Sequence, residues 1–407
     1  MQRIIVIGGG AAGMFAAYSS ASNGKSVTLI EKNEKLGKKI YITGKGRCNL
    51  TNDLLVEDFF KFVVTNPKFT YSCINAFSPH DTMSFFENNG LSLKTERGNR
   101  VFPLSDKASD VTKTLEKVLK NSGVEIILNT SVTKILTSDN KVCGVLLDNG
   151  KKFDCDGVIV CTGGNSYTST GSTGDGYLFA KENGHKIIPL KPALVGIELK
   201  GDEFVSLQGQ SLKNVSLTAK MNEKIIYNDF GEMLFTHFGI SGPIVLSCSS
   251  IINKFSSNEI DFYIDLKPAL DVQTLDNRLI REFSENNVKE LTNVMRSLLP
   301  KALIQTVLRQ AQVKQSKKCS EITQLERQRI INSLKNLKFE FKKFRPLQEA
   351  IVTSGGVCVK EINPKTMQSK LMDGLSFAGE VLDIDAFTGG FNLQLAFSTG
   401  YVAGKNI

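Results

Sequence analysis

The six residues Gly8-Gly9-Gly10-Ala11-Ala12-Gly13 have the spacing G-x-G-x-x-G, which predicts a binding site for a pyrophosphate group. Gly8 permits a tight turn, Gly10 lets the backbone approach the phosphates, and Gly13 lets a helix pack closely on a sheet. A helix that begins at Ala11 offers free N–H groups and the positive end of its dipole to the phosphates. The motif therefore predicts nucleotide binding at a helix N-terminus.

The elements predicted around this motif have the order strand, helix, strand. Residues 3–7 are predicted to be a buried strand, residues 11–23 a helix of small residues, and residues 26–31 a second strand. Such a βαβ unit has parallel strands and a right-handed crossover. Glu31 ends the second strand, where its carboxylate can accept hydrogen bonds from ribose hydroxyls and would repel a 2′-phosphate. Motif, elements and Glu31 together predict a Rossmann-type dinucleotide site in a protein of the α/β class.

Further blocks of sequence indicate which dinucleotide is bound. They are Leu36-Gly37-Lys38-Lys39 with Thr43–Asn52, Arg100–Pro103, Thr236–Pro243, Thr353–Val357, and Gly379–Asp383 with Thr388–Gln394. With these blocks the chain resembles, nearly end to end, the aminoacetone oxidase-like family of three-domain FAD flavoproteins (NAD(P)/FAD-dependent oxidoreductases). The resemblance implies FAD as the cofactor, together with an FAD domain, a β-rich domain and a helical domain.

The loop after the Rossmann unit has residue types that suit a flavin nucleotide. Gly44 brings backbone near a ligand, Arg47 can meet phosphate or flavin oxygens, and Asn49 can both donate and accept hydrogen bonds at the polar edge of the flavin. The alternative is a glycine-bearing surface turn. We assign Lys32, beside Glu31, to the same cofactor site.

Two further segments are expected to return the chain to the cofactor. Thr162 and Gly163 form a turn after a strongly apolar strand, and in related flavoproteins such a turn leads toward the FAD. By resemblance, Val132 corresponds to the residue whose backbone contacts adenine. An ordinary buried strand valine is the alternative for Val132.

The C-terminal block is expected to complete the site. Gly379 precedes Glu380 and Asp383, two carboxylates near a strand end that can accept bonds from ribityl hydroxyls, although either could be a surface acid. Asn392 and Leu393 begin the last helix. Its N-terminal N–H groups can face the N1–C2=O edge of the flavin, where negative charge accumulates on reduction. The alternative is a helix start that only packs.

The substrate side has two candidates for catalytic residues, Arg100 and His237, which could bind or protonate a substrate near the flavin. A structural hydrogen-bonding role is the alternative for each. No second G-x-G-x-x-G follows a predicted strand, because no strand leads into Gly171–Gly176. Either a small substrate reduces the flavin directly, or NAD(P)H binds transiently as the electron donor.

Composition and charge limit the remaining possibilities. Apolar residues make up 41% and charged residues 22% of the 407 residues, as in an ordinary folded protein. No apolar stretch is long enough to span a membrane, so we expect a cytoplasmic protein. The scattered eight cysteines and three histidines predict no metal site.

The net charge is +9, and residues 271–345 carry sixteen Lys/Arg and eight Asp/Glu. This stretch is either a solvated helical face or a surface for nucleic acid.

These observations predict an α/β protein with a discontinuous FAD domain. The FAD domain is predicted to comprise residues 1–190 and 350–407. A β-rich domain is predicted to comprise residues 191–270 and 337–349, and a helical insertion is predicted to comprise residues 271–336. The predicted function is FAD-dependent oxidation or reduction of a small organic substrate, with hydride passing through the flavin. The alternative is a flavoprotein that binds or modifies nucleic acid through the basic stretch.

Overall fold

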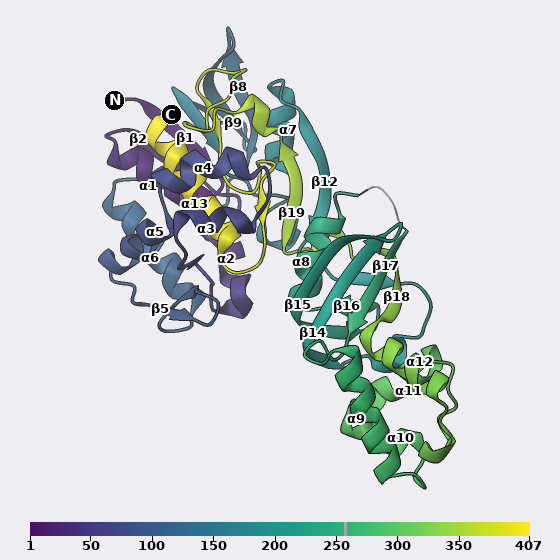
Figure 1. Ribbon diagram of the computed structural model, residues 1–407. Coiled ribbons are helices and arrows are strands. Elements are labelled where there is room, and N and C mark those ends of the chain that lie inside the picture. Colours follow the sequence, from purple (N-terminus) through teal and green to yellow (C-terminus); the bar gives the residue numbers. More distant parts are fainter. Residues whose placement is uncertain (256–258) are drawn as a thin grey trace. The chain divides into compact units, whose positions relative to one another are not determined.

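The computed structural model describes residues 1–255 and 259–407, which divide into two compact units. Unit 1 comprises Met1–Ala193 and Leu347–Ile407, and unit 2 comprises Leu194–Pro346. Figure 1 shows the elements of both units. The main helices and strands of unit 1 are β1 (Arg3–Ile7), α1 (Ala11–Ser22), β2 (Ser26–Ile30), α2 (Lys38–Ile42), β3 (Thr51–Asn52), α3 (Val56–Phe59), β4 (Val63–Thr65), α4 (Pro67–Ala76), α5 (Pro79–Asn88), β5 (Leu93–Glu96), β6 (Arg100–Pro103), α6 (Ala108–Asn121), β7 (Glu125–Ile127), β8 (Val132–Ser138), β9 (Lys141–Leu147), β10 (Lys152–Asp154), β11 (Gly157–Val160), α7 (Asp175–Glu182), β12 (Ile187–Ala193), β19 (Val352–Val357), β20 (Leu375–Phe377), β21 (Asp385–Ala386) and α13 (Phe391–Asn406).

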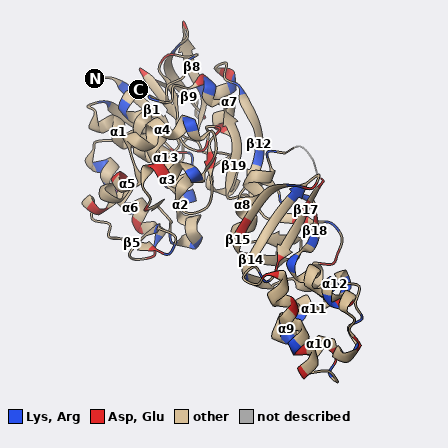
Figure 2. Ribbon diagram, in the orientation of Figure 1, with Lys and Arg blue, Asp and Glu red and all other residues tan. Residues whose placement is uncertain are grey.

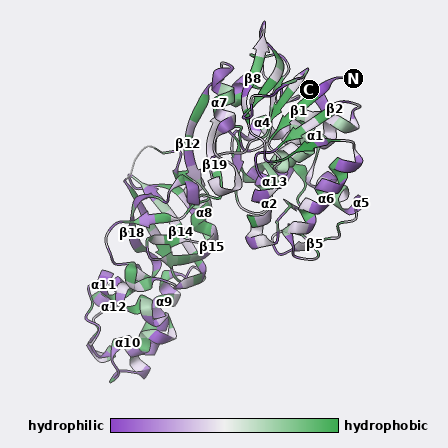
Figure 3. Cartoon of the chain, turned by 180° about the vertical axis from the view of Figure 1, so that it is seen from behind, coloured by the Kyte–Doolittle hydropathy of each residue, from purple (hydrophilic) through white to green (hydrophobic). Residues whose placement is uncertain are grey.

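The centre of unit 1 is a parallel sheet with the strand order β20-β11-β1-β2-β7. Its strands are apolar because helices cover them: Val6, Leu29 and Val158 are completely buried. In Figure 3 the strand β1 is coloured as hydrophobic, whereas α6 presents hydrophilic residues. The α/β class and the Rossmann-type parallel sheet predicted from the sequence are confirmed.

Helices α1 and α13 pack against each other through small residues, although they come from opposite ends of the chain. A Cβ atom added at Gly400 would lie 2.2 Å from the Ala12 carbonyl oxygen, and one added at Gly404 would lie 2.2 Å from that of Ala16. The glycines therefore allow the two backbones to approach closely. This contact fixes the N-terminus of α13 in unit 1.

Unit 2 contains a closed barrel with the strand order β13-β16-β15-β14-β17-β18. A buried cluster that includes Phe235, Phe262 and Phe339 fills it, and helices α9–α12 lie between β17 and β18 in the sequence. The elements of unit 2 are β13 (Ile197–Leu199), β14 (Ser211–Met221), β15 (Lys224–Thr236), β16 (Gly239–Ser241), α8 (Pro243–Ile252), β17 (Ile260–Asp265), α9 (Val272–Glu285), α10 (Leu291–Val294), α11 (Lys301–Gln310), α12 (Gln324–Lys335) and β18 (Leu337–Phe344).

A buried histidine is expected to make the stability of unit 1 depend on pH. The His185 side chain is fully buried, with Nδ1 3.2 Å from Glu361 Oε2 and Nε2 2.9 Å from Ser369 Oγ. Burial lowers the pKa of His185, and Glu361 opposes this shift. Below the ordinary histidine pKa of about 6.5, the unfolded chain therefore takes up a proton that the folded chain does not. The free energy of unfolding should fall as the pH decreases from about 7 to about 5.

Urea unfolding at a series of pH values measures this dependence. Between about pH 7 and pH 5, His185→Gln should reduce the slope of the free energy of unfolding against pH. His80→Gln should retain this slope, because the His80 side chain is 59% exposed. Equal slopes for wild type and His185→Gln would show that His185 does not cause the dependence.

Candidate FAD and active site

Most of the predicted cofactor residues follow the carboxyl ends of neighbouring strands of the parallel sheet. Gly8 follows β1, Glu31 follows β2, Thr162 comes after β11, and Gly379 comes after β20. Carboxyl ends of parallel strands meet at one edge of the sheet, where doubly wound folds bind nucleotides. The topology thus brings together residues that lie far apart in the sequence.

The three motif glycines differ in what a side chain would meet. Gly8 has φ +102°, and a Cβ there would lie 2.6 Å from the Cys161 carbonyl oxygen. A Cβ at Gly13 would lie 1.8 Å from the Gly8 carbonyl oxygen, so Gly13 is required for packing. Gly10 is the N-cap of α1 with φ −81°, and a Cβ there meets no atom within 4 Å. The open space in front of α1 lies where the motif predicts the pyrophosphate.

Glu31 is 7% exposed and is held beside the glycine motif. Its Oε2 accepts a hydrogen bond from Gly9 N at 2.6 Å, and its Oε1 accepts one from Asn33 N at 2.8 Å. A carboxylate has further lone pairs, so it can still accept bonds from ribose hydroxyls. Thr130 N donates to the Glu31 carbonyl oxygen, and this brings the start of β8, at Val132, close to the end of β2.

Lys32 forms an ion pair that joins two parts of unit 1. Its Nζ lies 2.6 Å from Asp175 Oδ2 and 2.5 Å from Thr173 Oγ1. The side chain thus connects the end of β2 with the first residue of α7. Its assignment to the cofactor stays a prediction.

Among the predicted cofactor residues and their neighbours, three buried polar atoms have no hydrogen-bonding partner in the described part of the chain: Asn49 Oδ1, Thr162 Oγ1 and the Tyr177 hydroxyl. Buried polar groups are nearly always paired, and a bound molecule with donors and acceptors would satisfy these atoms. FAD offers oxygen and nitrogen acceptors and hydroxyl donors along its whole length. These atoms and the space at Gly10 therefore fit FAD.

The C-terminal block is anchored to the same region. Glu380 Oε2 lies 2.7 Å from Lys39 Nζ, and Glu380 Oε1 accepts hydrogen bonds from Ser166 Oγ and Thr353 N. Gly379 has φ +80°, and a Cβ there would lie 2.7 Å from the Ala12 Cβ. The chain therefore passes directly over the start of α1.

The side chains of Asp383 and Asn392, which the sequence assigns to the cofactor, form hydrogen bonds within the protein. Asp383 Oδ2 accepts a hydrogen bond from Asn66 Nδ2 at 2.9 Å. The Asn392 side chain pairs with the backbone N–H and carbonyl of Ala386, at 2.9 and 2.7 Å, so it has a structural role. The first intrahelical bond of α13 runs from Gln394 N to Gly390 O, so the N–H groups of residues 391–393, Leu393 included, have no intrahelical acceptor.

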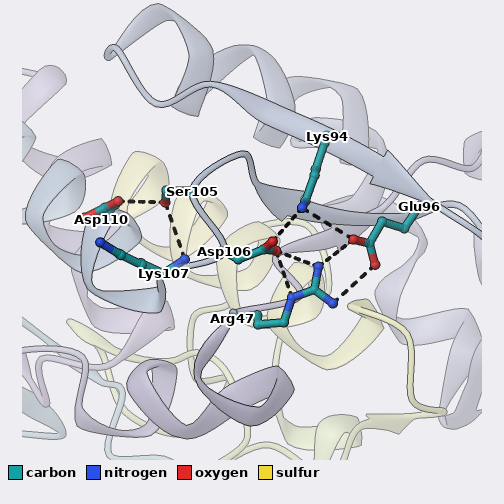
Figure 4. Close-up of polar contacts among 7 residues, drawn as sticks. All are labelled: Arg47, Lys94, Glu96, Ser105, Asp106, Lys107 and Asp110. Carbon is teal, nitrogen blue, oxygen red and sulfur yellow. Dashed lines mark hydrogen bonds and ion pairs between the residues drawn. The ribbon is translucent and has the colours of Figure 1, made fainter.

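Arg47 is engaged by carboxylates of unit 1 (Figure 4). Its Nη2 lies 2.5 Å from both Glu96 Oε1 and Asp106 Oδ1, and the guanidinium lies over the Phe102 ring. Lys94 Nζ lies 2.7 Å from Asp106 Oδ2. Arg47 lowers the pKa of Glu96, and Lys94 and Arg47 lower that of Asp106. The network fastens the Gly44–Asn49 loop to β5, and the contact of Arg47 with phosphate or flavin stays a prediction.

The two candidate catalytic residues lie in different units. Arg100 is exposed at the start of β6 in unit 1, and its Nε donates to the Arg97 carbonyl oxygen at 3.0 Å. His237 is exposed between β15 and β16 in unit 2, with its ring centroid 5.1 Å from that of Phe238. Their action on a substrate stays a prediction.

Lys39, Ser166 and Tyr177 are not among the site residues predicted from the sequence, although all three lie near the predicted cofactor residues Glu380 and Asp383. The signal for Tyr177 is the glycine-rich segment Gly171–Gly176, which leads into α7. In the sequence this segment resembles only a second dinucleotide motif. Gly176 packs at the end of β11, since a Cβ there would lie 2.2 Å from Thr162 Oγ1.

Comparison with known proteins identifies the family. Residues 2–406 match the family model described as the HI0933-like protein Rossmann domain. The chain belongs to the HI0933-like family. It is 32% identical over 409 residues to the 3-dehydro-bile acid delta(4,6)-reductase of Clostridium scindens, covering 100% of this chain and 98% of that protein. It is 33% identical over 408 residues to the ribosomal RNA dihydrouridine synthase of Haemophilus influenzae, covering 99% and 98%.

Solved structures support the fold. The open conformation of a flavocytochrome c3 fumarate reductase matches with a TM-score of 0.53 and 19% identity, covering 100% of this chain and 78% of that chain. This likeness concerns the fold alone.

The family match and the full-length similarity to a reductase identify the protein as an FAD-dependent oxidoreductase. The narrower aminoacetone oxidase-like resemblance stays a prediction. Within residues 1–255 and 259–407, no helix has the length and apolar character needed to cross a membrane. In the same part of the chain, no cluster of three or more His, Cys, Asp or Glu side chains could hold a metal ion.

Proposed function

We propose that this protein reduces a carbon–carbon double bond conjugated with a carbonyl group. The observation that carries the proposal is the full-length similarity to two enzymes whose names describe this chemistry. A 3-dehydro-delta(4,6) bile acid has a ketone conjugated with two double bonds. A dihydrouridine synthase saturates the C5–C6 bond of uracil, which is conjugated with a ring carbonyl. In both substrates a hydride can add to the carbon β to the carbonyl, and a proton to the α carbon.

The residues of unit 1 supply the binding and the electrostatics for this reaction. FAD, when bound and reduced by a donor such as NADH or NADPH, would supply the hydride. The α1 N-terminus at Gly10 would hold the pyrophosphate, and Glu31 would hold the ribose. The N–H groups at the start of α13 would favour negative charge on the flavin. In unit 1, Arg100 is our candidate for binding the carbonyl oxygen or donating the proton. His237, in unit 2, is a separate candidate for either role.

The substrate that we favour is a uracil base within RNA, because the helical part of unit 2 has exposed cations without acidic partners. Arg296, Lys301, Lys314 and Lys318 are exposed, and none has an ion pair with any other described residue. By contrast, Arg309 lies 3.5 Å from Glu203 and Lys317 lies 2.7 Å from Glu326. Figure 2 shows the basic residues of this part of the chain in blue. Unpartnered cations suit a phosphate backbone.

A small enone such as a steroid is the second candidate, and the bile acid reductase supports it. The helical region also supports it: between residues 271 and 336 the only aromatic residue is Phe283, which is buried. These helices therefore have no exposed ring on which a base could stack. In the RNA hypothesis they would contact phosphates only.

A product assay tests the proposal and separates the two substrates. Purified protein is incubated with NADH or NADPH, and with either ribosomal RNA from cells that lack this gene or a 4-ene-3-keto steroid. We expect dihydrouridine, detected by mass spectrometry of digested nucleosides, in the RNA. Reduction of the steroid alone would favour the second candidate. If neither substrate gains hydrogen although the nicotinamide reduces the flavin, the proposal is wrong.

A further inference from the structure

Tyr177 is a buried tyrosine whose hydroxyl lacks a partner in the described part of the chain. The residue lies in the first turn of α7 and is only 7% exposed. A buried hydroxyl without a hydrogen bond destabilises a protein, because its bonds to water are lost on folding. Such an atom is retained where it has a partner in the working state.

The first turn of α7 packs against the turns that follow β11 and β20. A Cβ at Gly176 would lie 2.2 Å from Thr162 Oγ1 and 2.8 Å from Val381 Cγ2, so no larger residue fits beside Tyr177. Asp175, which precedes Gly176, forms an ion pair with Lys32. Thr162 Oγ1 is itself buried and without a partner among residues 1–255 and 259–407. Two orphaned hydroxyls therefore lie at the edge of the sheet where the cofactor is expected.

Burial, together with nearby carboxylates, keeps the Tyr177 hydroxyl protonated. Burial raises its pKa, and the carboxylates of Glu380 and Asp383 raise it further. The side chain is therefore a neutral phenol that can donate a hydrogen bond throughout the working pH range. Glu380 forms no hydrogen bond with the Tyr177 hydroxyl. Its oxygens bind Lys39, Ser166 and Thr353 instead.

We propose that the Tyr177 hydroxyl donates a hydrogen bond to an oxygen of the ribityl–pyrophosphate chain of FAD. This inference rests on the FAD site of the proposed function and adds a cofactor-binding residue from a segment outside the glycine motif. The chain of FAD between the flavin and the adenosine carries only hydroxyl and phosphate oxygens, which are good acceptors for a phenol. The hydroxyl that is unsatisfied in the polypeptide alone thus becomes paired in the holoprotein.

The test compares Tyr177→Phe with wild type in two measurements on the full-length protein after removal of FAD. In calorimetric titration, the Kd for FAD should rise about three- to tenfold if the acceptor is a neutral ribityl oxygen, and by more than about tenfold if it is a charged phosphate oxygen. The melting temperature of the apoprotein should stay the same or rise, because the variant removes an unpaired buried hydroxyl. If Tyr177 has only a structural role, the variant should leave the Kd for FAD unchanged and lower the melting temperature of the apoprotein.

Tyr227→Phe is the matched control. The Tyr227 hydroxyl in unit 2 is also buried, but it lies 3.0 Å from Asp229 Oδ2 and 2.9 Å from the Ile244 carbonyl oxygen. This variant should melt at a lower temperature and bind FAD with unchanged affinity. The same titrations with ADP locate the contact: weaker binding of both FAD and ADP supports a phosphate oxygen, and weaker binding of FAD alone supports a ribityl oxygen.

An unchanged Kd for FAD in Tyr177→Phe would overturn the inference. That result is distinct from failure of the proposed function, because the titration contains no substrate. A wild-type protein that binds FAD normally but reduces neither RNA nor enone would leave the assignment of Tyr177 intact.

Discussion

Replacement of Gly10 by valine is expected to give a folded protein that purifies without its yellow cofactor. The backbone at Gly10 has φ −81°, which any residue can adopt, and a Cβ there meets no atom within 4 Å. The valine therefore fits the polypeptide but fills the space in front of the α1 N-terminus, where the pyrophosphate is expected. We expect the affinity for FAD to fall by at least about a hundredfold, which corresponds to ~2.7 kcal/mol.

Gly13→Val is the control that separates loss of cofactor from loss of fold. Its Cβ would lie 1.8 Å from the Gly8 carbonyl oxygen, so β1 and α1 could not pack as they do. This variant should misfold, as seen by circular dichroism and thermal melting, whereas Gly10→Val should keep the wild-type spectrum. If Gly10→Val retains flavin at the wild-type stoichiometry, our position for the pyrophosphate is wrong.

Neutralising four exposed cations is expected to have the largest effect on RNA binding. The variant changes Arg296, Lys301, Lys314 and Lys318 to glutamine. Each lost phosphate contact should reduce the slope of log affinity against log salt by about 0.7–0.9. At physiological salt the affinity should fall on the order of a hundredfold. Filter binding of ribosomal RNA at a series of salt concentrations measures both quantities.

The matched control removes charges that already have partners. Changing Arg309, Glu203, Lys317 and Glu326 to glutamine deletes two ion pairs and leaves the net charge as it is. RNA affinity should then stay close to wild type, and the quadruple cation variant should still bind FAD with the wild-type affinity. If the quadruple cation variant binds RNA as tightly as the control variant, the helices of unit 2 are a solvated surface that does not contact RNA.

The sequence was sufficient to predict the nucleotide-binding part of the fold because that signal is local. The turn at Gly8, the helix after Gly10 and the carboxylate of Glu31 lie in one βαβ unit, so their roles follow from spacing alone. The orientation of the C-terminal block depends on contacts between α1 and α13, which only the small residues at Gly400 and Gly404 indicate.

Other features of the site depend on partners that are distant in the sequence. The sequence suggests that Arg47 is available for an anion, but in the fold its charge is shared by Glu96 and Asp106. Tyr177 is one of many tyrosines until the packing of α7 buries its hydroxyl without a partner. Spacing rules do not capture such pairings, because they arise when separate elements come together.

The central claim, that the flavin delivers hydride to a conjugated double bond, is tested most directly by reoxidation without oxygen. The protein is first reduced anaerobically with NADH or NADPH until the flavin absorbance bleaches. Ribosomal RNA that lacks dihydrouridine, or a 4-ene-3-keto steroid, is then added. We predict that the flavin absorbance returns and that one reduced double bond appears in the product for each flavin reoxidised. A flavin that stays bleached with both substrates and recovers only when oxygen is admitted would contradict the account.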